Sequence, residues 1–122
     1  MSSERPVNLS FGTVIKQPFV ALASITHRIT GVALFGGIGF LLWWLDKALS
    51  SPAGFAEVAA DPSFKLLVWL ILVALGYHFF AGIKHLMLDM HIADTAGAGR
   101  VMTVISVGLA ALSAVLAGVW IW

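Results

Sequence analysis

The residues best suited to chemistry are histidines, and the most informative of them is His78. It lies inside a charge-free apolar run, six residues before Lys84, which places it about 9 Å within the boundary of that run. Ala74 and Gly82 flank it at one helical turn on the same face. Small neighbours leave a flat recess beside the ring, and neutral imidazole is a common axial ligand of haem iron. A histidine that forms a hydrogen bond across a helix interface would give the same pattern.

A second group of polar residues shares one helical face earlier in the chain. Ser24, His27, Arg28 and Gly31 follow the spacing i, i+3, i+4 and i+7. A hydroxyl, an imidazole and a planar guanidinium could bind a quinone carbonyl, haem propionates or a lipid headgroup. The alternative is an Arg28 that only extends to lipid phosphate as a topology anchor. If His78 binds iron, the second ligand would come from His27 or from another chain.

Further candidates follow His78 along the same segment. His85 returns to the face of His78 about 10 Å nearer the membrane surface, where it could contact a propionate or a partner subunit. Asp89, one turn on, could fix the tautomer of His85 or carry a proton. A solvated pair at the interface is the simpler interpretation and is favoured. We expect His91 in a loop and assign Tyr77 to packing.

Three apolar segments must position these residues. The charge-free runs are 29–45, 66–83 and 101–122, and they contain 17, 18 and 22 residues. As helices they span roughly 26–33 Å, the thickness of a bilayer core. Alternating apolar and polar residues are absent, which argues against a membrane β-barrel. The sequence predicts an all-α integral membrane protein with three transmembrane helices.

The distribution of charge and tryptophan predicts how the helices are oriented. Five cationic residues flank one side of the membrane and two the other (Arg5, Lys16, Arg28, Lys84 and Arg100, against Lys47 and Lys65). The positive-inside rule therefore places the N-terminus in the cytoplasm or matrix and the C-terminus outside. All five tryptophans then lie at the outer face and the four histidines at or near the inner face. We expect the polar chemistry near the inner surface.

The chain is expected to form a single membrane-anchor domain over 1–122, with helices at about 19–45, 63–90 and 100–121. We expect residues 1–17 to be extended, 46–63 to be an outer connection and 94–99 to be a turn. Asp61 followed by Pro62 is a typical helix start. A small residue recurs at every fourth position of the last helix, which allows close packing within the chain or against a second subunit (Ser106, Ala110, Ala114, Gly118).

Composition excludes several functions. There is no cysteine, so the chain cannot form a disulfide or hold a cysteine-ligated iron–sulfur cluster by itself. A net charge of +1 gives no indication of nucleic-acid binding. A small homo-oligomeric transporter would be expected to carry an acidic residue at mid-membrane, and none of the three charge-free runs contains one.

Two motifs resemble those of the cytochrome b556 subunit of succinate dehydrogenase. Residues 24–31 are similar to its SxxHRxxG signature, and residues 78–85 to HxxxGxRH with Lys84 in place of arginine. Residues 5–9 also fit the RPVNL-type start of that family. The resemblance covers nearly the whole chain, and both motifs occur in the expected order. Lysine at position 84 keeps the positive charge of the motif, but it cannot form the paired hydrogen bonds of an arginine guanidinium.

The resemblance implies a membrane anchor of succinate:ubiquinone oxidoreductase in a bacterial inner membrane, rather than a mitochondrial one. It implies haem b shared with a second anchor subunit, with His78 as the axial iron ligand and the other ligand from that subunit. Ser24 and Arg28 match residues of the ubiquinone site, and His27, Arg28 and His85 the haem propionate environment. Electrons would come from an iron–sulfur subunit, while a flavoprotein subunit oxidises succinate. The alternatives are the anchor of a fumarate reductase and a non-redox membrane scaffold.

Overall fold

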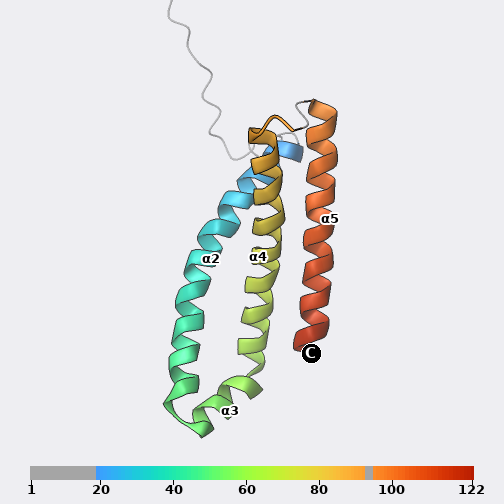
Figure 1. Ribbon diagram of the computed structural model, residues 1–122. Coiled ribbons are helices and arrows are strands. Elements are labelled where there is room, and N and C mark those ends of the chain that lie inside the picture. Colours follow the sequence, from blue (N-terminus) through green and yellow to red (C-terminus); the bar gives the residue numbers. More distant parts are fainter. Residues whose placement is uncertain (1–18, 93–94) are drawn as a thin grey trace, which may run out of the picture.

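The fold is a bundle of long helices, and the computed structural model describes residues 19–92 and 95–122 of it (Figure 1). The described part contains α2 (Phe19–Ser50), α3 (Pro52–Ala60), α4 (Pro62–Asp89) and α5 (Ala96–Ile121). Within it, three helices are long and apolar enough to cross a membrane: Phe19–Ser50, Pro62–Asp89 and Gly97–Ile121. The prediction of an all-α protein with three such helices is therefore confirmed. The extended segment expected at 1–17 lies outside the described residues.

The connection between the first two long helices is more helical than the sequence predicted. α2 continues past Leu45 to Ser50, because the charges of Asp46 and Lys47 mark a change of environment and do not break a helix. α3 then begins at once, with the Ser51 hydroxyl accepting a hydrogen bond from Gly54 N at 2.9 Å and Pro52 in its first turn. Lys47 of α2 forms a 3.1 Å ion pair with Glu57 of α3.

The predicted helix start at Asp61 and Pro62 is confirmed. The Asp61 carboxylate accepts a hydrogen bond from Ser63 N at 2.8 Å, and Pro62 begins α4. The turn predicted at 94–99 is largely wrong, since α5 begins at Ala96 and Gly97 and Gly99 lie in its first turn. The Thr95 hydroxyl caps this helix by accepting from Ala98 N at 3.2 Å. Such a cap offsets part of the free-energy cost of placing the two glycines in a helix.

α4 is the central helix and packs against both α2 and α5 (Figure 1). The small-residue stripe of α5 faces α4: Ser106 and Ala110 are buried, and the Trp69 indole donates a 3.0 Å hydrogen bond to Ala114 O. A Cβ added at Gly118 would lie 3.3 Å from Trp69 Nε1. Of the two interpretations of this stripe, close packing within the chain is therefore the correct one.

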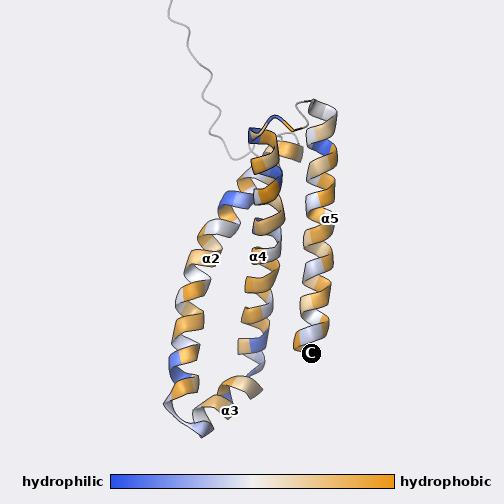
Figure 2. Cartoon of the chain, viewed as in Figure 1, coloured by the Kyte–Doolittle hydropathy of each residue, from blue (hydrophilic) through white to orange (hydrophobic). Residues whose placement is uncertain are grey.

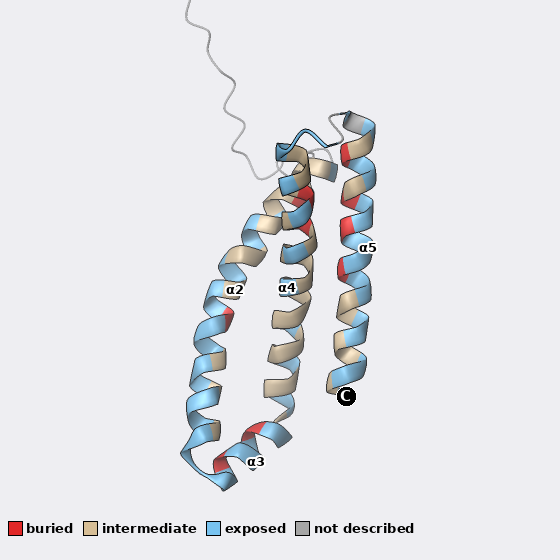
Figure 3. Cartoon of the chain, in the orientation of Figure 1, coloured by how far each residue is buried: buried red, intermediate tan, exposed pale blue. Residues whose placement is uncertain are grey.

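The exterior of the bundle is apolar. Figure 2 shows hydrophobic residues along the whole length of the long helices, and Figure 3 shows that most residues of these helices are exposed or half-buried. A helix that is hydrophobic all round requires an apolar environment, which here is lipid or a partner subunit. The antiparallel order places Trp43, Trp44, Trp69, Trp120 and Trp122 toward one end of the bundle, which we call the tryptophan end.

Candidate functional site

Three histidines meet at the opposite end of the bundle, which we call the histidine end. His27 comes from the first half of α2, and His78 and His85 come from the second half of α4. The rings of His27 and His78 are stacked, with centroids 4.1 Å apart and planes inclined by 10°. The ring of His85 lies 5.2 Å from that of His27 at an angle of 57°. Residues 51 positions apart in sequence thus form one cluster between two helices.

The hydrogen bonds of His78 define which ring nitrogen is available. Its Nδ1 lies 3.0 Å from His27 O and 3.2 Å from the Thr30 hydroxyl oxygen. The hydroxyl itself donates to His27 O at 2.8 Å. Because a carbonyl oxygen can only accept, Nδ1 must carry the proton and donate. The unprotonated nitrogen is then Nε2, with which no described residue forms a hydrogen bond.

Two glycines allow the rings to approach the opposing helices. A Cβ added at Gly31 of α2 would lie 3.1 Å from His78 Cε1, closer than most such contacts. A Cβ added at Gly82 of α4 would lie 3.4 Å from His27 Nε2. Each histidine therefore packs on a glycine of the partner helix. The recess expected beside His78 at Gly82 is occupied on one side by the His27 ring.

Three polar nitrogens in this region are buried and have no hydrogen-bond partner among the described residues: His27 Nε2, Lys84 Nζ and His85 Nε2. Lys84 is 2% exposed, and its charge acts on both His27 and His85. Buried polar atoms without partners are costly, so such groups commonly mark a place where a ligand or partner supplies the missing donor or acceptor.

The remaining candidate residues lie at the rim of the cluster. Ser24 is half-buried and Arg28 is exposed, and neither forms a hydrogen bond or ion pair with another described residue. Arg28 is close enough to act electrostatically on His85, as is Asp89 at the end of α4. His91 lies in the turn after α4 with a positive φ of 57°, in agreement with the loop expected there.

Sequence reasoning missed the roles of Thr30 and Tyr77. Thr30 bridges His27 and His78, and its spacing of three residues from His27 was the available signal. The Tyr77 hydroxyl donates to Ala23 O at 2.8 Å and so joins α4 to α2 beside the cluster. The packing role assigned to Tyr77 is thus accompanied by a specific hydrogen bond that only the helix pairing reveals.

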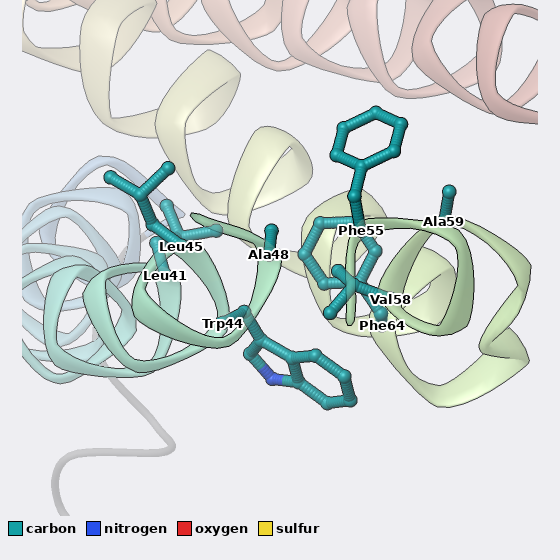
Figure 4. A pocket seen from close by; sticks show the side chains of 8 residues that line it. All are labelled: Leu41, Trp44, Leu45, Ala48, Phe55, Val58, Ala59 and Phe64. Atoms are coloured by element: carbon teal, nitrogen blue, oxygen red, sulfur yellow. The ribbon is translucent and has the colours of Figure 1, made fainter. Parts of the chain in front are cut away.

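A separate apolar cavity of about 450 Å³ lies at the tryptophan end (Figure 4). Its lining comes from the end of α2, from α3 and from the start of α4, and includes Trp44, Phe55 and Phe64. It has no histidine in its lining and lies at the other end of the bundle from the cluster. The chemistry of the described residues is therefore concentrated at the histidine end.

Comparison with known proteins identifies the family of the chain. Residues 1–118 match the family described as succinate dehydrogenase/fumarate reductase transmembrane subunit. The chain is 36% identical to the succinate dehydrogenase cytochrome b556 subunit of Coxiella burnetii over 126 aligned positions that cover both chains fully. It is 41% identical to the subunit of that name from Paracoccus denitrificans, over 62% of this chain and 61% of that one. The corresponding subunit of Rickettsia typhi is 35% identical over 64% and 62%.

The match to the family covers nearly the whole chain, and the relatives carry one name. The motifs around His27 and His78, which first indicated the resemblance, are the segments that form the histidine cluster. The chain belongs to the family of succinate dehydrogenase/fumarate reductase transmembrane subunits.

Proposed function

We propose that this chain is a haem b-binding membrane anchor of a succinate:ubiquinone oxidoreductase, with His78 as an axial ligand of the haem iron. The observation that carries the proposal is the contact between His78 Nδ1 and the backbone carbonyl of His27 on the facing helix. The Nδ1–H of His78 donates to His27 O and approaches the Thr30 hydroxyl, so the lone pair of Nε2 is the available one. Fixing one ring nitrogen by a carbonyl is the usual way in which proteins orient a metal-ligating histidine. The cytochrome name of the relatives supports the same cofactor.

The second iron ligand would come from a second anchor subunit. The rings of His27 and His78 are stacked face to face with centroids 4.1 Å apart, so they are not placed to hold one haem iron between them. This arrangement argues against His27 as the second ligand. A haem shared between two chains fits these observations, and when bound it supplies a one-electron carrier.

The residues of this chain would orient the reactants and hold protons. Ser24 and Arg28 have no protein partner among the described residues, so their hydroxyl and guanidinium are available to bind the oxygens of ubiquinone. A guanidinium stabilises negative charge that develops on a quinone oxygen during reduction. The Nε2 atoms of His27 and His85 would lie in the propionate environment, together with Arg28.

The electrons would come from an iron–sulfur subunit, and a flavoprotein subunit would oxidise succinate. Neither cysteine ligands nor a flavin motif occur in this chain, so it would not act on succinate alone. The complex would lie in a bacterial inner membrane. The alternative is the anchor of a fumarate reductase, which the family description also covers. The succinate dehydrogenase names of the relatives favour the first function.

The cofactor assignment is tested on the purified complex with His78→Ala. We expect the reduced-minus-oxidised spectrum to lose its low-spin b-type bands while all subunits remain associated. His91→Ala is the control, since it removes a histidine from the turn after α4. An unchanged low-spin spectrum in the assembled His78→Ala complex would remove His78 as a ligand.

The quinone assignment is tested separately with Ser24→Ala and Arg28→Leu. We expect both to lower ubiquinone reduction while the membrane-bound complex still oxidises succinate with an artificial acceptor. Losing one neutral hydrogen bond corresponds to about 0.5–1.5 kcal/mol, so Ser24→Ala should be the milder change. A normal rate and affinity for ubiquinone in Arg28→Leu would make the arginine only a lipid anchor.

A further inference from the structure

One turn of α2, residues 23–27, is attached to α4 at both of its ends by side chains of two adjacent residues. At its beginning, the Tyr77 hydroxyl donates a 2.8 Å hydrogen bond to Ala23 O. At its end, His78 Nδ1 lies 3.0 Å from His27 O. The two carbonyls are four residues apart, about one helical turn. The backbone of this segment, which we call the Ser24 turn, is therefore held against α4 at two points.

The Ser24 turn carries the two residues assigned to the quinone. Ser24 directly follows the residue whose carbonyl Tyr77 holds, and Arg28 directly follows the residue whose carbonyl His78 contacts. Neither side chain forms a hydrogen bond or ion pair with another described residue, so the backbone of α2 decides where each of them lies. A misplacement of about 1 Å at a reacting group can lower the rate about 100-fold.

Tyr77 contributes position and no chemistry of its own to this arrangement. Its side chain is half-buried, and its single polar atom is hydrogen-bonded to the backbone of a residue that is 7% exposed. Membrane helices gain nothing from apolar contact that lipid does not also offer, so a hydrogen bond between helices helps to fix how they are rotated against each other. The bond from Tyr77 to Ala23 O fixes α2 directly beside Ser24.

We propose that Tyr77 is a positioning residue for ubiquinone reduction, acting through Ala23 O to hold the Ser24 hydroxyl where it meets the quinone. The inference rests on the proposed quinone site and adds to it a residue that does not touch the substrate. The Tyr77 hydroxyl keeps its proton, directed at the carbonyl. The expected signature is weaker quinone binding with an intact haem and an intact complex.

The test is Tyr77→Phe in the complete purified complex, which removes one oxygen atom from the side chain. We expect the KM for ubiquinone to rise about fivefold, which corresponds to about 1 kcal/mol, the size of one lost hydrogen bond. We expect kcat to change far less, and the reduced-minus-oxidised haem spectrum and succinate oxidation with an artificial acceptor to keep their values.

Trp69→Phe is the matched control. It removes a bond of the same kind, from a side chain of α4 to a backbone carbonyl of a neighbouring helix, at the tryptophan end of the bundle. We expect it to lower the melting temperature of the complex and to leave the KM for ubiquinone unchanged. An equal rise in KM in both variants would show that any loosening of the bundle weakens quinone binding, and would overturn the positioning role.

A double-mutant cycle with Ser24→Ala identifies the group on which Tyr77 acts. Tyr77→Phe should raise KM much less in the Ser24→Ala chain than in the native one, because the hydroxyl that it positions is then missing. The same fold-change in both chains, or a normal KM in Tyr77→Phe alone, would overturn the proposal. A Tyr77→Phe complex that does not assemble would also overturn it, since the hydroxyl would then serve folding. A normal KM in Ser24→Ala alone would instead contradict the quinone site itself, so the two failures are distinguishable.

Discussion

At the residue scale, the availability of His78 Nε2 as a ligand depends on contacts that fix the His78 ring from two sides. The carbonyl of His27 and the hydroxyl of Thr30 hold Nδ1, and the His27 ring covers one face. The Gly31 Cα completes the pocket, since a Cβ there would lie 3.1 Å from the ring. The ring can shift only by giving up its hydrogen bonds or its stacking, so the position of His78 is sensitive to the size of residue 31.

Gly31→Val should therefore displace His78 without breaking the helix. Overpacking of this kind typically costs about 1–3 kcal/mol. We expect a lower melting temperature of the purified complex, together with a changed b-type spectrum. Gly39→Val is the matched control, because it introduces the same side chain into the same helix where no neighbouring atom lies within 4 Å. Equal effects of the two variants would show that only helix propensity, and not the His78 contact, had been disturbed.

At the element scale, α4 and α5 are held together by close approach rather than by large interlocking side chains. Ala81 and Ala110 are buried, the Thr103 side chain is fully buried, and Trp69 donates to a backbone carbonyl of α5. Membrane helices associate through such packing because lipid offers no hydrophobic advantage to apolar contact. A small increase in volume on this face should separate the helices.

Ala110→Leu should destabilise this seam by about 1–3 kcal/mol. Ala111→Leu makes the same substitution one residue later on the same helix, where the side chain is exposed. We expect a clear decrease in melting temperature for Ala110→Leu alone, measured in detergent for the assembled complex. If Ala111→Leu is the more harmful of the two, the exposed face of α5 is the one that carries a protein contact.

At the scale of the whole molecule, the bundle has two chemically different ends. Arg28, Lys84 and Arg100 lie with the clustered histidines, and Lys47 and Lys65 lie near α3 with the tryptophans. Arg5 and Lys16 belong to the segment before the described residues. Because cytoplasmic loops carry an excess of Lys and Arg, this difference in charge predicts the direction in which the protein is inserted into the membrane.

Reporter fusions should place the histidine end in the cytoplasm. A fusion after Trp122 and an insertion in α3 should both report the outer side, because the positive-inside rule weighs five cations against two. Removing Arg5 and Lys16 together should weaken this preference. A cytoplasmic signal from the fusion after Trp122 in the unmodified chain would reverse the expected orientation and move the quinone site to the other surface.

The sequence by itself determined the features that depend on one helix at a time. Run length and hydropathy predicted three spanning helices, and the positions of tryptophan and histidine predicted two distinct ends. The four-residue spacing of Ser106, Ala110, Ala114 and Gly118 defined a packing face. These properties follow from a fixed rise and twist per residue, so they can be calculated without knowing where any other helix lies.

Only the tertiary structure decided which faces meet. The stacking of His27 on His78, the contact of His78 Nδ1 with His27 O and the burial of Lys84 all depend on how α2, α4 and α5 are rotated against one another. The helix α3 was missed because it has only nine residues and its start is set by the Ser51 cap, which is a local contact and not a periodic pattern. Helix rotation is set by side-chain packing between distant segments, and such packing leaves no periodic signal in either segment alone.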